Sequence, residues 1–246
     1  MRGLSVVLRD GRARCALVWS VVSASSLVAT AGWSQTLTWL GTLSGPFSLG
    51  NGVSADGSVV VGLARNDSGL VRTFRWTQAT GMQDLGTLGG TESIARSASA
   101  DGSVVVGWAR DADGQGRAFR WTASGGMQDL GTLGGNSDAA GVSADGSVMV
   151  GSAYNAAGQS RAFRWTLWGG MEDLNQTYAS LLTNGSLLVS AFAISPDGRY
   201  IVGMGYNAAA GRYNEAFLLD TVPEPASLMA LGAGLTGLIR LRRRKR

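Results

Sequence analysis

The 246-residue chain contains 21 lysine and arginine residues and 17 aspartate and glutamate residues, a net charge of +4. Ten basic residues lie in the first fourteen or last seven positions, and two acidic residues, Asp10 and Glu224, lie outside residues 32–222. That segment therefore holds 11 basic and 15 acidic residues, a net charge of −4. It lacks the basic surface that nucleic-acid phosphates require, so we expect no nucleic-acid partner. The chain has no histidine, and its one cysteine is Cys15. Histidine-dependent catalysis is therefore excluded, as are disulfides and thiolate or imidazole metal sites in residues 32–222.

The N-terminal segment is predicted to be a secretion signal. Four arginines within residues 1–14 precede the uncharged, mostly apolar residues 15–31, which end in Ala29-Thr30-Ala31. A basic start, an apolar run and small residues before the cleavage site are the three parts of a signal peptide. We therefore predict that residues 1–31 are removed, with Ala29 and Ala31 read by the signal peptidase, and that the rest of the chain is exported.

The middle of the chain repeats one unit four times. Its first motif, SADGSVVVG, occurs in two identical and two divergent copies, at residues 54–62, 99–107, 143–151 and 195–203. An aromatic motif of the form RAFRWT follows, at residues 72–77, 117–122 and 161–166, with a divergent copy at 215–219. A third motif, GMQDLGTLGG, occurs at residues 81–90 and 126–135, is degraded at 170–176, and has a partial copy, LGTL, at 40–43. Self-similarity at 44 to 52 residues is typical of repeat folds.

Each unit is predicted to contain four short strands. Asp-Gly in the first motif marks a hairpin turn, because glycine adopts positive φ without a Cβ clash. The valine run that follows is continuously apolar, which predicts burial on both faces. The aromatic motif and residues 82–88 supply further strands. Four strands in about 45 residues match a propeller blade, whereas a β-helix coil would be shorter. We therefore predict an all-β fold over residues 32–221, a small four-bladed β-propeller.

Closure of the ring is predicted from a missing strand. The fourth unit meets Val222-Pro223 before its last strand, while the spare LGTL copy lies ahead of the first unit. We predict that residues 37–43 complete the fourth blade, with residues 39–43 antiparallel to residues 215–219. An open arc of blades, or a ring completed by a second chain, is the alternative.

The C-terminal segment is predicted to be a membrane and sorting tail, residues 222–246. Val222-Pro223-Glu224-Pro225 precedes an apolar run of 14 residues, 226–239, and a basic cluster. As a helix this run spans roughly 21 Å, short of a bilayer core of about 30 Å. Bilayer thinning or arginine snorkelling can close that gap, and the cluster would remain cytoplasmic. We predict a transmembrane helix over residues 226–239, with the repeats outside.

Two resemblances follow from these motifs. Pro223-Glu224-Pro225, the apolar run and the arginines resemble the PEP-CTERM sorting signal of Gram-negative bacteria. That resemblance implies recognition and processing by an exosortase, a membrane enzyme, and delivery to the cell surface or exopolysaccharide matrix. Residues 37–220 resemble the HAF family of bacterial extracellular repeats, with Arg117-Ala118-Phe119 and Arg161-Ala162-Phe163 in place of His-Ala-Phe. The HAF resemblance implies no established activity and no site residues.

Candidate sites within the repeats all have plain structural interpretations. The recurrent carboxylates lie in turns or before a strand: Asp56, Asp101, Asp145 and Asp197, and Asp84, Asp129 and Asp173. Asp111 and Asp113 resemble the start of a calcium loop, but no glutamate closes it. The arginines and tryptophans of the aromatic motif have two interpretations. They could form an exposed sugar-binding surface. We favour a structural role, in which the tryptophan packs between blades and the arginine pairs with a turn aspartate of a neighbouring blade. These pairs are Arg75 and Trp76, Arg120 and Trp121, and Arg164 and Trp165.

The sequence thus predicts no catalytic, cofactor-binding or metal-binding residue. It favours an exported surface or matrix protein that acts as a non-catalytic binding or structural module. The expected partners are an exosortase, the inner membrane and a surface glycan such as exopolysaccharide. The alternative is a secreted carbohydrate-active enzyme that uses paired carboxylates.

Overall fold

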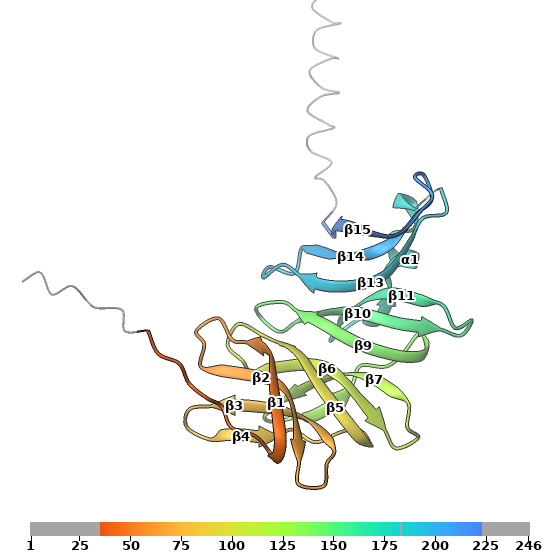
Figure 1. The fold of residues 1–246 in the computed structure, drawn as a ribbon. Coiled ribbons are helices and arrows are strands. Elements are labelled where there is room, and N and C mark those ends of the chain that lie inside the picture. The colour runs from red at the N-terminus through yellow and green to blue at the C-terminus, as the bar shows by residue number, and fades with distance from the viewer. Residues whose placement is uncertain (1–34, 183, 223–246) are drawn as a thin grey trace, which may run out of the picture. The chain divides into compact units, whose positions relative to one another are not determined.

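The computed structural model describes residues 35–182 and 184–222 (Figure 1). The chain divides into two compact units, Met1–Thr38 and Trp39–Arg246, and every strand belongs to the second. The predicted signal peptide with Ala29 and Ala31, the motif residues Pro223, Glu224 and Pro225, and the predicted helix 226–239 lie outside the described residues. No helix in the described part of the chain is long and apolar enough to cross a membrane.

The described residues form four antiparallel sheets, one for each sequence repeat, which follow one another in chain order (Figure 1). Repeat 1 contains β1 (Ser44–Val53), β2 (Val59–Asn66), β3 (Val71–Thr77) and β4 (Gly81–Asp84). Repeat 2 contains β5 (Gly89–Ala98), β6 (Val104–Asp111), β7 (Gly116–Thr122) and β8 (Gly126–Asp129). Repeat 3 contains β9 (Gly134–Val142), β10 (Val148–Asn155), β11 (Ser160–Thr166) and β12 (Gly170–Asp173). Repeat 4 contains β13 (Leu187–Ile194), β14 (Tyr200–Asn207) and β15 (Arg212–Asp220), and the short helices α1 (Leu174–Thr177) and η1 (Ala179–Leu181) precede it.

The Ser-x-Asp-Gly turn joins the first two strands of every repeat. In repeat 2 the buried Ser99 hydroxyl donates to Asp101 Oδ1 (2.6 Å) and accepts the Val104 N–H (3.0 Å). Gly102 has a φ of +66°, which favours glycine because it has no Cβ. Asp101 also accepts the Ser103 N–H (2.9 Å). The predicted Asp-Gly hairpins are therefore confirmed, with serine as a further member of the turn.

Apolar packing between consecutive sheets forms the core. Val105 and Trp121 of repeat 2 pack in one cluster with Val61 of repeat 1, whereas Val106 lies in a second cluster with Phe163 of repeat 3. A third cluster joins repeats 3 and 4. The second strand of repeat 2 is thus buried on both faces, as its continuous apolarity predicts. Each fully buried valine or phenylalanine contributes about 1.5–3 kcal/mol.

A ladder of backbone hydrogen bonds links the turns of successive repeats. Ala55 N–H donates to Ala100 O (2.8 Å), Ala100 N–H to Ala144 O (3.0 Å), and Ala144 N–H to Pro196 O (2.9 Å). Proline has no N–H, so the ladder ends at the turn of repeat 4. The repeats are therefore held in one register relative to their neighbours.

The predicted last strand is shorter than its motif. Strand β4 ends at Asp84, whose carboxylate accepts the Gly86 N–H (2.8 Å), and Gly86 has a φ of +81°. The following residues lead into the next sheet, where Leu88 forms a bridge with Asp111. The LGTL motif is therefore a linker between repeats and not part of an outer strand.

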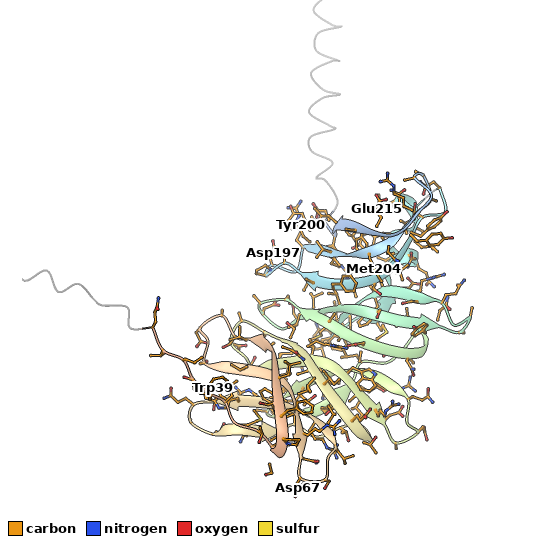
Figure 2. The ribbon with its side chains drawn as sticks, viewed as in Figure 1. Trp39, Asp67, Asp197, Tyr200, Met204 and Glu215 are labelled. Atoms are coloured by element: carbon orange, nitrogen blue, oxygen red, sulfur yellow. The ribbon has the colours of Figure 1, made fainter. Side chains whose placement is uncertain are left out.

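This linker role contradicts the predicted ring closure. Leu43 forms the same type of bridge, with Asn66 of its own repeat, so residues 40–43 lead into β1 as Leu88 leads into β5. Within the described residues, the sheet of repeat 4 ends at β15 and has no fourth strand. Trp39 is 86% exposed and lies beside repeat 1, whereas Glu215 lies in repeat 4 (Figure 2). The missing fourth strand is confirmed, but residues 39–43 do not replace it.

We predict that Ser99→Ala destabilises the protein by about 1–3 kcal/mol, because it leaves the buried Val104 N–H without its side-chain acceptor. Ser103→Ala is the matched control, because the Ser103 hydroxyl is exposed and bonds only Asp101. It should change stability by less than about 0.5 kcal/mol. Urea unfolding monitored by circular dichroism measures both, and equal effects would contradict the structural role of Ser99.

Candidate functional site

The recurrent turn aspartates are held by their own turns. The Ser58 N–H and the Ser54 hydroxyl lower the pKa of Asp56 to about 2. The Ser99 hydroxyl, with the Ser103 N–H, lowers the pKa of Asp101 to about 2. Serine hydroxyls and backbone N–H groups shift the pKa values of Asp145 and Asp197 in the same direction. A glycosidase acid needs a raised pKa, so these carboxylates are poorly suited to that role.

The loop of Asp111 and Asp113 is closed by hydrogen bonds. Asp111 accepts the N–H groups of Asp113 (3.0 Å) and Gln115 (2.8 Å). Arg117 Nε donates to it at 2.8 Å, and this hydrogen bond is the main cause of a lowered Asp111 pKa. Within residues 35–182 and 184–222, no three acidic side chains gather as a metal site would require.

The motif tryptophans of repeats 2 and 3 pack between sheets. Trp121 contacts the cluster shared with repeat 1, and Trp165 contacts the cluster shared with repeat 2. The structural interpretation is confirmed for these two residues. The arginine partners differ from the prediction: Arg75 Nε donates to the Gly102 carbonyl (3.2 Å) and not to a turn aspartate, and Arg164 pairs with Glu172 in its own repeat.

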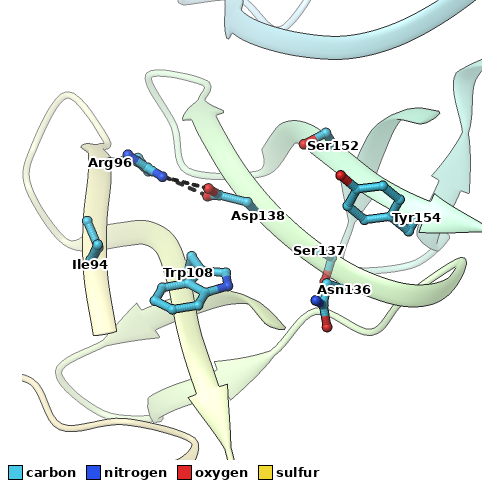
Figure 3. Close-up of a pocket in the computed structure, with 8 residues that line it drawn as sticks. All are labelled: Ile94, Arg96, Trp108, Asn136, Ser137, Asp138, Ser152 and Tyr154. Carbon is cyan, nitrogen blue, oxygen red and sulfur yellow. Dashed lines mark hydrogen bonds and ion pairs between the residues drawn. The ribbon is translucent and has the colours of Figure 1, made fainter. Parts of the chain in front are cut away.

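A groove of about 460 Å³ lies where repeats 2 and 3 meet (Figure 3). Strands β5, β6, β9 and β10 line it with Ile94, Arg96, Trp108, Asn136, Ser137, Asp138, Ser152 and Tyr154. Arg96 crosses between the repeats and pairs with Asp138, with Nη2–Oδ2 at 2.8 Å and Nε–Oδ1 at 3.5 Å. Figure 3 shows this pair between β5 and β9, with Trp108 on β6 and Tyr154 on β10.

Ser137 occupies the same position as Ser48 and Ser93, but other residues that line the groove stand where the repeats differ. Strand pairing places Trp108 at the position of Leu63, Ser152 and Met204 in the other repeats. Gly116 makes room for it, because a Cβ there would lie 2.2 Å from Trp108 Nε1. Arg96 likewise corresponds to Asn51 in repeat 1. Core positions repeat whereas these do not, which indicates a role specific to this groove.

The groove combines aromatic rings with planar polar groups. Arg110 lies over the Trp108 ring at 5.4 Å and donates to Glu92 (3.1 Å), which fixes the indole from one side. Tyr154 is 48% exposed, and its ring and hydroxyl are accessible. The wall of the groove thus places two aromatic rings beside five polar side chains, those of Arg96, Asn136, Ser137, Asp138 and Ser152. The arrangement suits a ligand with apolar ring faces and many hydroxyl groups.

Sequence reasoning did not identify this groove. Its residues lie outside the three repeated motifs, so the repeat pattern does not predict them. One signal was present in the sequence: tryptophan occupies position 108, where no other repeat has an aromatic residue.

The comparisons with known proteins concern the tail and the fold. Residues 221–245 match the PEP-CTERM protein-sorting motif, which implies export with transient membrane anchoring and recognition by an exosortase. Of the residues predicted for this motif, Val222 lies in the described part; it is 50% exposed, and its N–H donates to Asp220 (3.1 Å). No curated protein matches the chain in sequence.

The solved structures show a likeness of fold. TolB from Acinetobacter baumannii is 16% identical with a TM-score of 0.51, over 71% of this chain and 41% of that chain. Putative TolB from Agrobacterium tumefaciens is 16% identical with a TM-score of 0.50, over 69% of this chain and 60% of that chain. The chain thus spans less than two thirds of either relative. These neighbours are β-propeller-like, and the likeness supports a fold of repeated β units.

The turn aspartates predict an acid-sensitive fold. Their pKa values are lower in the folded than in the unfolded chain, so they stabilise the fold above about pH 4 and lose this effect as the pH falls towards 2. We expect the unfolding temperature to fall over this range, and to fall less steeply in Asp56→Ala/Asp101→Ala. Gln128→Ala, at an exposed side chain without a titratable group, should keep the parent slope. Equal slopes in all three proteins would contradict the prediction.

Proposed function

We propose that the protein is an exported, surface-sorted module that binds a saccharide chain without modifying it. The observation that carries the proposal is the groove between repeats 2 and 3, where Trp108 and Tyr154 can stack on sugar rings while Arg96, Asn136 and Asp138 bond hydroxyl groups.

Sorting supports a saccharide as the ligand. The PEP-CTERM motif at residues 221–245 takes an exported protein to an exosortase. We propose that residues 226–239 anchor the chain in the inner membrane until processing, and that the repeats then enter the cell surface or exopolysaccharide matrix. We also assign the repeats to the HAF type, on the motif RAFRWT.

A non-catalytic role is favoured over a glycosidase. Asp138 is the one carboxylate among the eight residues that line the groove, and it is paired with Arg96. Retaining and inverting glycosidases use two carboxyl groups across the scissile bond. Hydrolysis of a bound oligosaccharide that is lost in Asp138→Asn would favour the enzyme instead.

We predict that Trp108→Ala weakens saccharide binding roughly ten- to thirtyfold, because a truncated aromatic anchor commonly costs about 1.4–2 kcal/mol. The full chain is tested against an array of bacterial exopolysaccharide fragments, and the binding isotherm of each positive fragment is then measured by calorimetry. Trp168→Ala is the matched control, because Trp168 is 95% exposed in the β11–β12 turn, outside the groove. No saturable fragment, or equal losses in both variants, would contradict the proposal.

The sorting proposal has a separate test. Replacing Glu224 and Pro225 by alanine removes two of the residues that match the motif. We expect the variant to accumulate unprocessed in the inner membrane, as measured by its mass and by cell fractionation. Unchanged processing and surface delivery would contradict the assignment.

A further inference from the structure

Every interior repeat presents two faces, and each is covered by a neighbouring repeat. We call the face of a repeat that contacts the repeat before it the preceding face, and the face that contacts the repeat after it the following face. On the preceding face of repeat 2, Val105, Trp121 and Met127 are cross-strand neighbours. On its following face, Val104 and Val106 meet repeat 3. The three junctions of the chain all join a following face to a preceding face.

Repeat 1 keeps a complete preceding face, although none of the other described repeats packs on it. Val53, Val60, Trp76 and Met82 are cross-strand neighbours in this order. The last three correspond to Val105, Trp121 and Met127 of repeat 2. Val53 is 59% exposed. Terminal units of repeat arrays normally carry polar outer faces. Repeat 1 instead keeps the residues that make a junction.

Repeat 4 has the complementary face free of contacts with the other described repeats. Val202 occupies the position of Val61, Val106 and Val150, which are fully buried, yet it is 42% exposed. Its partner Leu218 is 69% exposed and replaces the motif arginine. Figure 2 shows Tyr200 and Met204 on the same strand. The following face of repeat 4 therefore exposes two apolar side chains, Val202 and Leu218, that pair across strands β14 and β15.

We propose that a second copy of the chain covers both faces. The following face of repeat 4 in one copy packs on the preceding face of repeat 1 in the other, which continues the junction that the chain already makes three times. Two such contacts close a ring of eight sheets, within the size range of propellers. A contact between unlike faces closes into a ring when its rotation permits. The inference rests on the end faces and not on the saccharide groove.

The new junction lacks the turn-ladder bond, which all three interior junctions have, and the arginine bond that is present between repeats 1 and 2. Pro196 has no N–H to continue the turn ladder, whose interior bonds are 2.8–3.0 Å long. Leu218 cannot reproduce the bond from Arg75 Nε to the Gly102 carbonyl. Association therefore depends on apolar contact, and it is weaker than the packing within one chain.

Cysteine cross-linking of the full chain, with Cys15→Ser in every variant, tests the pairing of faces. Leu218→Cys mixed with Val53→Cys should give a cross-linked dimer with a short bismaleimide. Either variant alone should give little, because the two new thiols then lie at different junctions. Leu167→Cys mixed with Val53→Cys is the matched control, since Leu167 is also a leucine with 69% exposure and lies in the β11–β12 turn.

Four results would overturn the proposal. Cross-linking of Leu218→Cys alone indicates like faces in contact, and cross-linking of Val53→Cys alone indicates the same for repeat 1. Absence of cross-linking in the mixture, with both thiols reactive to a monofunctional maleimide, indicates a monomer. A thiol at position 218 that is unreactive in the full chain indicates that another segment covers the face.

Pro196→Ala provides an independent test, because it restores the missing donor of the turn ladder. We expect a dissociation constant for the dimer that is roughly two- to tenfold lower, the effect of one added hydrogen bond. Analytical ultracentrifugation of the full chain in mild detergent measures it. An unchanged or higher constant would overturn the assignment of this junction.

Discussion

Apolar packing between consecutive sheets is the interaction on which the rest of the structure depends. It works because the second strand of each repeat is apolar on both faces and because glycine ends each valine run. A Cβ at Gly107 would lie 2.1 Å from the Ile94 carbonyl, so the first and second strands can approach only with glycine there. The Ser-x-Asp-Gly turns and their backbone ladder then fix the register between sheets.

This regular frame leaves a small set of positions free to vary. The buried positions carry similar residues from repeat to repeat, whereas the positions of Arg96 on the first strand and Trp108 on the second strand lie outside the buried core and differ between repeats. Trp108, Arg96 and Asp138 occupy such positions, and they meet where two repeats join. The side chains of the proposed binding groove thus lie on strands, which hold them more precisely than loops would.

The sequence predicted the repeated part of the structure well and the unrepeated part poorly. The repeat length, the Asp-Gly turns and the two-sided burial of the valine strand followed from local patterns that determine local geometry. The LGTL motif was misread as a strand, because its leucines look like a strand until Gly86 turns the chain. The groove could not be derived, since Trp108 and Asp138 lie in different repeats and only the register between sheets brings them together.

The central claim is that the repeats build the frame and that departures from the repeat build the binding surface. Hydrogen–deuterium exchange of the full chain, with and without an exopolysaccharide fragment found to bind, tests it most directly. The account predicts new protection confined to peptides of β5, β6, β9 and β10 around Trp108 and Asp138. New protection from exchange that is centred on the third strands, which carry Arg75 and Trp76 and their equivalents, would contradict it. So would protection spread evenly over all four repeats.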